Sequence, residues 1–184
     1  MYNLAYLPTA FNPGIDEVVR GRFHFFCSAD AIVPVLYGAE IEDAAIAETI
    51  LQLSAQHHQR GWIFNETLKG RAIVSITPAI DLRLIELCGA GLQKLRLLPE
   101  EITSTRPSEY PRTIQWAKAL HGETPEAHGL LWMSHQFNTS KSLMLFGDRI
   151  EPPDLVAGAP VSLSGPAGRA LLEHAIRIAG LAII

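Results

Sequence analysis

The pattern of apolar and polar positions in the first third of the chain predicts two short strands and one helix. Met1–Leu7 and Ile32–Tyr37 have the short apolar runs of strands, and the loop Pro8–Gly14 follows the first. Pro34 cannot donate a ladder hydrogen bond, so we expect the second strand at a sheet edge or distorted at that residue. Apolar and small residues then recur at helical spacing over Glu40–His57, followed by a polar surface connection to residue 69.

The remaining chain continues with short strands and amphipathic helices. Strand patterns occupy Arg71–Ile76, Leu82–Leu87, Gly129–His135 and Ser142–Phe146, and helix patterns occupy Tyr110–Leu120 and Gly165–Gly180. A proline-rich segment over 151–160 is interpreted as a tail or linker rather than a domain boundary. We expect one domain, in which residues 1–150 form the catalytic body and 151–184 pack on it. The apolar face of the last helix is suited to docking on that body or on a partner, and terminal helices usually dock on their own domain.

Glu48 is the most informative residue of the first helix. In a regular helix over Glu40–Leu53, with about 3.6 residues per turn, its neighbours are Ile41, Ala44, Ala45, Leu51 and Gln52. The carboxylate then lies in a mostly apolar stripe, where an unpaired charge is costly and is seldom kept without a partner or a task. The alternative is that the side chain reaches solvent from the edge of the stripe and has no task.

Three further residues invite a functional interpretation, each with a plain alternative. Arg22, with apolar neighbours on one side, is either a surface arginine in a loop or an anion-binding arginine beside the core. Tyr37 closes a strand, so its ring meets the start of the following helix or belongs to the ordinary core. Ser134 lies at a strand end, where functional side chains are common and where serine is also a frequent filler.

Composition excludes several classes of protein. The chain has 184 residues and a formal net charge of −4, which suits one domain and gives no basic surface for direct nucleic-acid binding. Its 2 cysteines form no disulfide framework and favour a reducing compartment. The apolar run at 178–184 is far shorter than the roughly 18 residues of a membrane span, and nothing indicates export. We expect a cytoplasmic protein that is not membrane-bound.

Common nucleotide and metal motifs are missing from the sequence. It contains no G-x-G-x-x-G after a strand and no Gly-Lys-Ser or Gly-Lys-Thr phosphate loop. The 7 histidines have no spacing typical of a metal site, so we expect no metal. Ser134 and His135 are adjacent in a predicted strand and point to opposite faces, which makes them poor candidates for a nucleophile and its base.

Taken together, several ordered segments resemble the RES-domain family, which is named for an arginine, a glutamate and a serine. The segments are FNPG (Phe11–Gly14), GRF (Gly21–Phe23), VPVLYGAEIEDAAIAET (Val33–Thr49), YPRTIQWAKALH (Tyr110–His121), HGLLWMSHQ (His128–Gln136) and LFGDR (Leu145–Arg149). The matching positions are Arg22, Glu48 and Ser134, and Tyr37 matches a tyrosine that accompanies them.

The resemblance implies a fold akin to the ADP-ribosyltransferase toxins, which is an α/β (α+β) domain of small, mostly antiparallel sheets flanked by helices. It also implies consumption of NAD as a substrate, with ADP-ribose transferred to inorganic phosphate, to water or to a protein. Many relatives are toxins paired with an Xre-like antitoxin, so such a partner is expected here. Neither the acceptor nor toxicity follows from the sequence, and a homo-oligomer is one open state of assembly.

The chemistry that the resemblance implies suits the matched residues. Cleavage of the nicotinamide–ribose bond develops positive charge on the sugar, which the Glu48 carboxylate would stabilise. Arg22 offers a planar fork of donors for the pyrophosphate or an incoming phosphate, Tyr37 an aromatic face for nicotinamide, and Ser134 a hydroxyl for ribose or phosphate. The sequence-based hypothesis is an NAD phosphorylase or NAD glycohydrolase; a protein-directed ADP-ribosyltransferase and a non-catalytic binding module are the alternatives.

Overall fold

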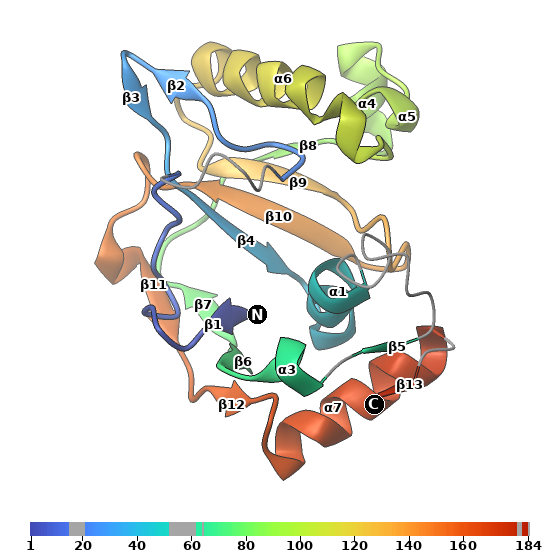
Figure 1. Cartoon of the computed structure of the whole chain (residues 1–184). Helices are drawn as coiled ribbons and strands as arrows, with labels where there is room; N and C mark the ends of the chain where they lie inside the picture. Colours follow the sequence, from blue (N-terminus) through green and yellow to red (C-terminus); the bar gives the residue numbers. More distant parts are fainter. Residues whose placement is uncertain (15–20, 52–61, 64, 180–181, 184) are drawn as a thin grey trace.

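A four-stranded sheet runs through the middle of the molecule (Figure 1). The computed structural model describes residues 1–14, 21–51, 62–63, 65–179 and 182–183. The strand order is β4 (Val35–Ala39), β10 (Lys141–Phe146), β9 (Gly129–Met133) and β8 (Leu84–Glu86). The first three strands are antiparallel and β8 is parallel to β9. Because β4 is an edge strand that begins directly after Pro34, the prediction from that proline is confirmed.

One face of this sheet is covered by three helices, α4 (Ala90–Leu95), α5 (Pro99–Ile102) and α6 (Tyr110–Glu123), and a short 3-10 helix, η2 (Pro107–Glu109), precedes α6 (Figure 1). The helix α6 turns Ile114, Ala117 and Leu120 toward the sheet, as their spacing predicts. These side chains share a core with Leu130, Trp132, Met144 and Phe146 of the sheet. Burying a large apolar side chain contributes roughly 1.5–3 kcal/mol, so this core anchors the helix layer firmly.

The opposite side of the molecule is built around a second core. The helix α1 (Glu42–Ile46) and the turn η1 (Ala47–Leu51) that continues it pack there with α3 (Asn65–Leu68) and α7 (Pro166–Ala179). A three-stranded sheet of β1 (Tyr2–Asn3), β6 (Arg71–Ile73) and β12 (Val161–Ser162) closes this side. The buried apolar face of α7 consists of Leu172, Ala175 and Ile176 and is covered by the chain's own core.

The proline-rich segment is structured. It contains a 3-10 helix, η3 (Pro152–Asp154), and the strand β11 (Leu155–Ala157), which pairs with β7 (Ile76–Pro78). Leu155 is buried in a third small cluster against the sheet. The interpretation of this segment as a tail or linker is therefore wrong, because short strand pairs form between residues that are distant in sequence.

Several other predicted elements differ in extent. The strand predicted over residues 1–7 is reduced to β1, and the one predicted over 71–76 is divided between β6 and β7. Two strand pairs were not predicted. The first joins β2 (Cys27–Ser28) to β3 (Ala31–Ile32), and the second joins β5 (Trp62–Ile63) to β13 (Ala182–Ile183). The polar connection expected over 56–69 contains β5 and α3 in its described part.

None of the described helices is long and apolar enough to cross a bilayer.

The end of α6 is held by the LFGDR segment. Arg149 donates from Nη1 to the carbonyls of Thr124 (2.8 Å) and Ala127 (2.6 Å), and from Nη2 to the carbonyl of His121. The Nε2 atom of the buried His121 lies 2.9 Å from Asp148 Oδ2. Because the last carbonyls of a helix have no partners within it, the bond to His121 satisfies one of them, and the bonds to Thr124 and Ala127 hold the loop between α6 and β9.

Replacement of Leu172 by alanine tests the second core. Leu172 is 0% exposed, so the cavity should lower the free energy of unfolding by about 2–5 kcal/mol. Urea denaturation followed by circular dichroism measures the loss. The control is Glu173→Ala on the exposed side of the same helix, which should leave stability nearly unchanged. Equal denaturation midpoints for the two variants would contradict the packing of α7 described above.

Candidate active site

Glu48 lies in a π-helical turn rather than in a regular helix. The helix α1 ends at Ile46, and η1 continues from Ala47 to Leu51 with wider spacing. Ile46 and Ile50, two residues to either side of Glu48, are buried in the second core. They hold the turn in place while the Glu48 side chain projects toward the end of β9. The regular helix predicted over 40–57 is therefore wrong after Ile46, and residues 52–57 lie outside the described part. Such π-helical turns are frequent at functional sites.

The carboxylate of Glu48 is held by the turn that follows β9. Its Oε1 atom accepts hydrogen bonds from the Ser134 hydroxyl at 2.7 Å, the His135 N–H at 2.7 Å and the Gln136 N–H at 3.2 Å. Glu48 therefore has partners within the protein, whether or not it has a catalytic task. Its other oxygen, Oε2, has no hydrogen-bond partner among the described residues. Among the described residues, one oxygen is held by three donors and the other has no partner.

The Ser134 hydroxyl takes part in two hydrogen bonds, one as a donor and one as an acceptor. It is 1% exposed and follows directly after β9. Its hydroxyl donates to Glu48, and its oxygen accepts the Phe137 N–H at 2.9 Å. The loop closes through a bond from the Ser134 N–H to the Ser140 carbonyl at 2.9 Å. Ser134 therefore orients Glu48, and its single proton is already used.

Tyr37 lies on the edge strand β4, opposite Met144 of β10. Its hydroxyl oxygen accepts the Phe23 N–H at 3.3 Å and lies 2.8 Å from His24 Nδ1. The ring meets Trp132 edge-on, with centroids 6.1 Å apart and an interplanar angle of 79°. These contacts join β4 to the segment that carries Arg22.

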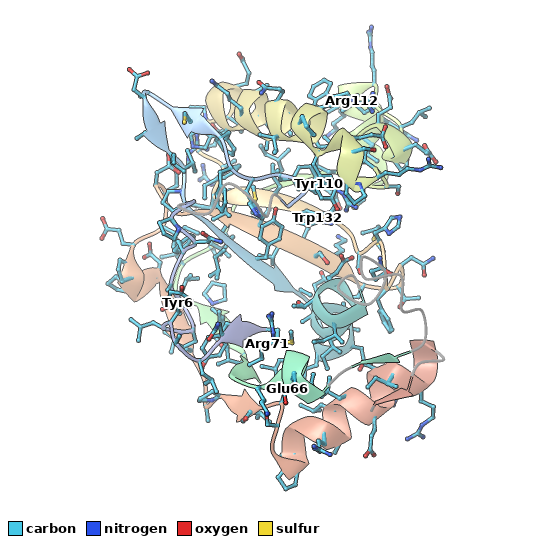
Figure 2. The ribbon with its side chains drawn as sticks, in the orientation of Figure 1. Tyr6, Glu66, Arg71, Tyr110, Arg112 and Trp132 are labelled. Atoms are coloured by element: carbon cyan, nitrogen blue, oxygen red, sulfur yellow. The ribbon has the colours of Figure 1, made fainter. Side chains whose placement is uncertain are left out.

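Arg22 is partly buried beside the start of α6, so it is not a solvated surface arginine. Its Nη2 lies 3.4 Å from the Thr105 carbonyl, and its guanidinium carbon lies 5.7 Å from the centroid of the Tyr110 ring. Tyr110 and Trp132 lie between α6 and the sheet (Figure 2). The Thr113 hydroxyl donates to the Arg22 carbonyl and fixes the backbone. The buried Nε atom has no hydrogen-bond partner among the described residues, so the guanidinium retains donors for an anion.

Electrostatics links the four residues. Burial raises the pKa of Tyr37 well above its ordinary value, and the nearby Glu48 charge acts in the same direction. The Phe23 N–H and the Arg22 charge act in the opposite direction and are outweighed. The phenol is therefore neutral at physiological pH, and its hydroxyl lies within electrostatic reach of Arg22 and Glu48. Glu48 and Ser134 are in direct contact, and the charges of Glu48 and Arg22 both act on the Tyr37 hydroxyl.

Sequence reasoning missed the residues that hold this arrangement. His24, Thr105, Tyr110 and Thr113 contact Arg22 or Tyr37 and were not singled out. A signal was available for His24, a polar residue within the apolar run that follows Arg22. The threonines and Tyr110 carry no such signal, because they contact Arg22 across more than 80 residues of chain. Among the described residues, no three His, Cys, Asp or Glu side chains are grouped as metal ligands.

The fold and the site define a mixed α/β protein of small, mostly antiparallel sheets, in which a clamped carboxylate lies near a tyrosine and an arginine. The chain belongs to the RES family, because the RES domain model matches residues 3–163. The family assignment from sequence and the predicted fold class are both confirmed.

Among solved structures, the chain is similar to one from the M. tuberculosis MbcT-MbcA toxin-antitoxin complex. The TM-score is 0.61 at 19% sequence identity, and the match covers 92% of this chain and 83% of that chain. At this identity the likeness concerns the fold. Comparison with curated proteins returns no significant match.

Replacement of Ser134 by alanine tests the clamp independently of any activity. The variant loses the hydroxyl that donates to Glu48 and leaves the Phe137 N–H without its acceptor, so the free energy of unfolding should fall by about 1–3 kcal/mol. Chemical denaturation measures the change. Ser142 is the matched control, because it is equally buried but its hydroxyl has no partner among the described residues. A Ser142→Ala variant that loses as much stability as Ser134→Ala would argue against the clamp.

Proposed function

We propose that this protein cleaves the nicotinamide–ribose bond of NAD and transfers the ADP-ribose to inorganic phosphate or water, acting as the toxin of a toxin–antitoxin pair. The observation that carries the proposal is the Glu48 carboxylate, which is fixed through one oxygen by three donors, while its other oxygen has no hydrogen-bond partner in the described part of the chain. Membership of the RES family and the positions of Arg22 and Tyr37 support it.

The reaction requires stabilisation of a cation. When the bond between the sugar carbon and the nicotinamide nitrogen breaks, its electron pair leaves with nicotinamide, which becomes neutral. Positive charge is then shared by the sugar carbon and the ring oxygen. A carboxylate about 4 Å away at an effective dielectric near 20 supplies about 4 kcal/mol of attraction, or roughly a thousandfold in rate if it acts only in the transition state.

Glu48 is suited to this task because it does not need to reorganise. Its Oε1 is already held by Ser134 and two backbone N–H groups, so the carboxylate keeps its direction while charge develops. We assign Ser134 to positioning, since its proton is used by Glu48 and its oxygen already accepts the Phe137 N–H. The earlier expectation of a ribose or phosphate contact from Ser134 has less support than this role.

Arg22 is the candidate for binding phosphate groups. Its guanidinium is partly buried and, among the described residues, its side chain makes one long hydrogen bond, to the Thr105 carbonyl, and lies over the Tyr110 ring, which leaves much of its donor fork for an anion. Such a fork matches two phosphate oxygens at once. In the second half of the reaction, an oxygen of phosphate or water bonds to the sugar carbon. A water molecule would release its proton to solvent, so the products balance without an oxidant or a reductant.

The toxin role rests on the fold and on an analogy. The similar solved structure comes from a toxin-antitoxin complex, and we extend that assignment to this chain as a proposal. An NAD-consuming enzyme would harm its own cell unless a partner restrained it. The formal net charge of −4 gives this chain little electrostatic attraction to DNA, so any DNA binding by the pair would come from the antitoxin.

The role of Glu48 is tested by replacement with glutamine. The amide keeps the size of the side chain and an acceptor oxygen, but it removes the charge, so nicotinamide release from NAD should fall by about a thousandfold while the fold is retained. Release is followed by chromatography of the purified protein incubated with NAD. The matched control is Glu42→Gln on the exposed start of α1, which should release nicotinamide at the wild-type rate. Full activity in the Glu48→Gln variant would remove Glu48 from the mechanism.

The acceptor is identified by the mass of the product. Release that depends on inorganic phosphate and yields ADP-ribose bearing an added phosphate establishes phosphorolysis, whereas release without phosphate that yields ADP-ribose establishes hydrolysis. Label that passes from NAD to a protein in a lysate would replace both assignments with protein modification. An absence of nicotinamide release under all these conditions would contradict the proposed function.

A further inference from the structure

The ring of His24 is hydrogen-bonded on both nitrogens. Its Nε2 atom lies 2.9 Å from the Gly21 backbone nitrogen, and its Nδ1 atom lies 2.8 Å from the Tyr37 hydroxyl oxygen. The ring packs so closely on Gly21 that a Cβ atom at that position would collide with it. His24 therefore closes the tight turn over 21–24, which carries Arg22.

The backbone contact determines where the proton of the neutral ring resides. The Gly21 N–H can only donate, so Nε2 must accept and cannot carry a proton itself. In the neutral ring the proton is then on Nδ1, which donates it to the Tyr37 oxygen. The opposite tautomer would set two N–H groups against each other at Gly21.

The donors around the Tyr37 hydroxyl determine in the same way where its own proton points. Its oxygen receives the Phe23 N–H and the His24 Nδ1–H, so both neighbours on the 21–24 turn are donors. The phenolic proton is left as a donor, and the described residues provide no acceptor for it. The rings of Trp132 and His24 pack against the tyrosine ring at steep angles, which further restricts its position.

We propose that His24 is a positioning residue, which locks Tyr37 as a hydrogen-bond donor to an oxygen atom of the substrate bound between Arg22 and Glu48. The inference rests on the proposed function for the identity of the substrate, NAD. Tyr37 would then recognise the substrate through its hydroxyl rather than by offering its face to nicotinamide. One histidine thus sets both the direction of this donor and the turn that places Arg22.

The tautomer is measured first, on the wild-type protein without NAD. Nitrogen-15 NMR of the histidine rings distinguishes a protonated Nδ1 from a protonated Nε2, and comparison with a His24→Asn sample assigns the signal. We expect the Nδ1–H form for His24. The Nε2–H form would overturn the inference whatever the enzyme does.

The functional test compares the rates of nicotinamide release of three variants of His24 and Tyr37, one double variant and one control. Loss of both ring contacts in His24→Leu should lower kcat for nicotinamide release by about tenfold. His24→Asn retains a donor close to the position of Nδ1 and should recover most of that loss. In a Tyr37→Phe background, His24→Leu should cause a clearly smaller loss, because the partner hydroxyl is already gone and only the contact with Gly21 remains to be lost. His174→Gln, a surface histidine on α7, is the control that should remain at the wild-type rate.

The outcomes separate the two proposals. If His24→Leu lowers kcat equally with and without the Tyr37 hydroxyl, His24 supports the fold alone and the positioning role is wrong. If the wild-type protein releases no nicotinamide, the proposed function fails, while the tautomer measurement still decides whether His24 donates to Tyr37. Circular dichroism of each variant shows whether a loss of rate reflects unfolding.

Discussion

The hydrogen bond from Ser134 to Glu48 joins the two halves of the molecule. Glu48 is carried by η1, whose Ile50 belongs to the core shared with α7, whereas Ser134 follows a strand whose core lies under α6. A partly buried carboxylate must find donors, and the turn after β9 supplies three of them to one oxygen. The position of the second oxygen is therefore determined by the packing of both cores.

The other side of the site depends on the turn over 21–24 in the same way. Thr113 of α6 holds the Arg22 carbonyl, and the Tyr37 hydroxyl on the edge strand receives the Phe23 N–H. The turn is thus attached to the helix layer and to the sheet. Because Arg22 and Glu48 are carried by different elements, their separation is set by tertiary packing around Tyr37, whose pKa both charges affect.

The sequence identified the residue types of the site but could not identify their hydrogen-bond partners. Helical spacing located α6 and its buried face, and Pro34 indicated an edge strand. The π turn at Glu48 was missed because it depends on contacts that a helical repeat does not encode. The strand β11 was missed for a similar reason, since its partner β7 lies far away in sequence. The sequence-based hypothesis assigned the ring face of Tyr37 to nicotinamide binding, whereas in the structure its hydroxyl is hydrogen-bonded to Phe23 and His24.

A crystal structure of the Glu48→Gln variant with NAD tests the central claim most directly, because the substitution slows turnover while preserving the shape of the site. We predict that the sugar carbon attached to nicotinamide lies beside the side-chain atom of residue 48 that takes no part in the hydrogen bonds to the turn after β9. The pyrophosphate should contact the Arg22 guanidinium, and a substrate oxygen should accept a hydrogen bond from the Tyr37 hydroxyl. NAD bound elsewhere on the molecule, or bound with its nicotinamide ribose turned away from residue 48, would contradict the account.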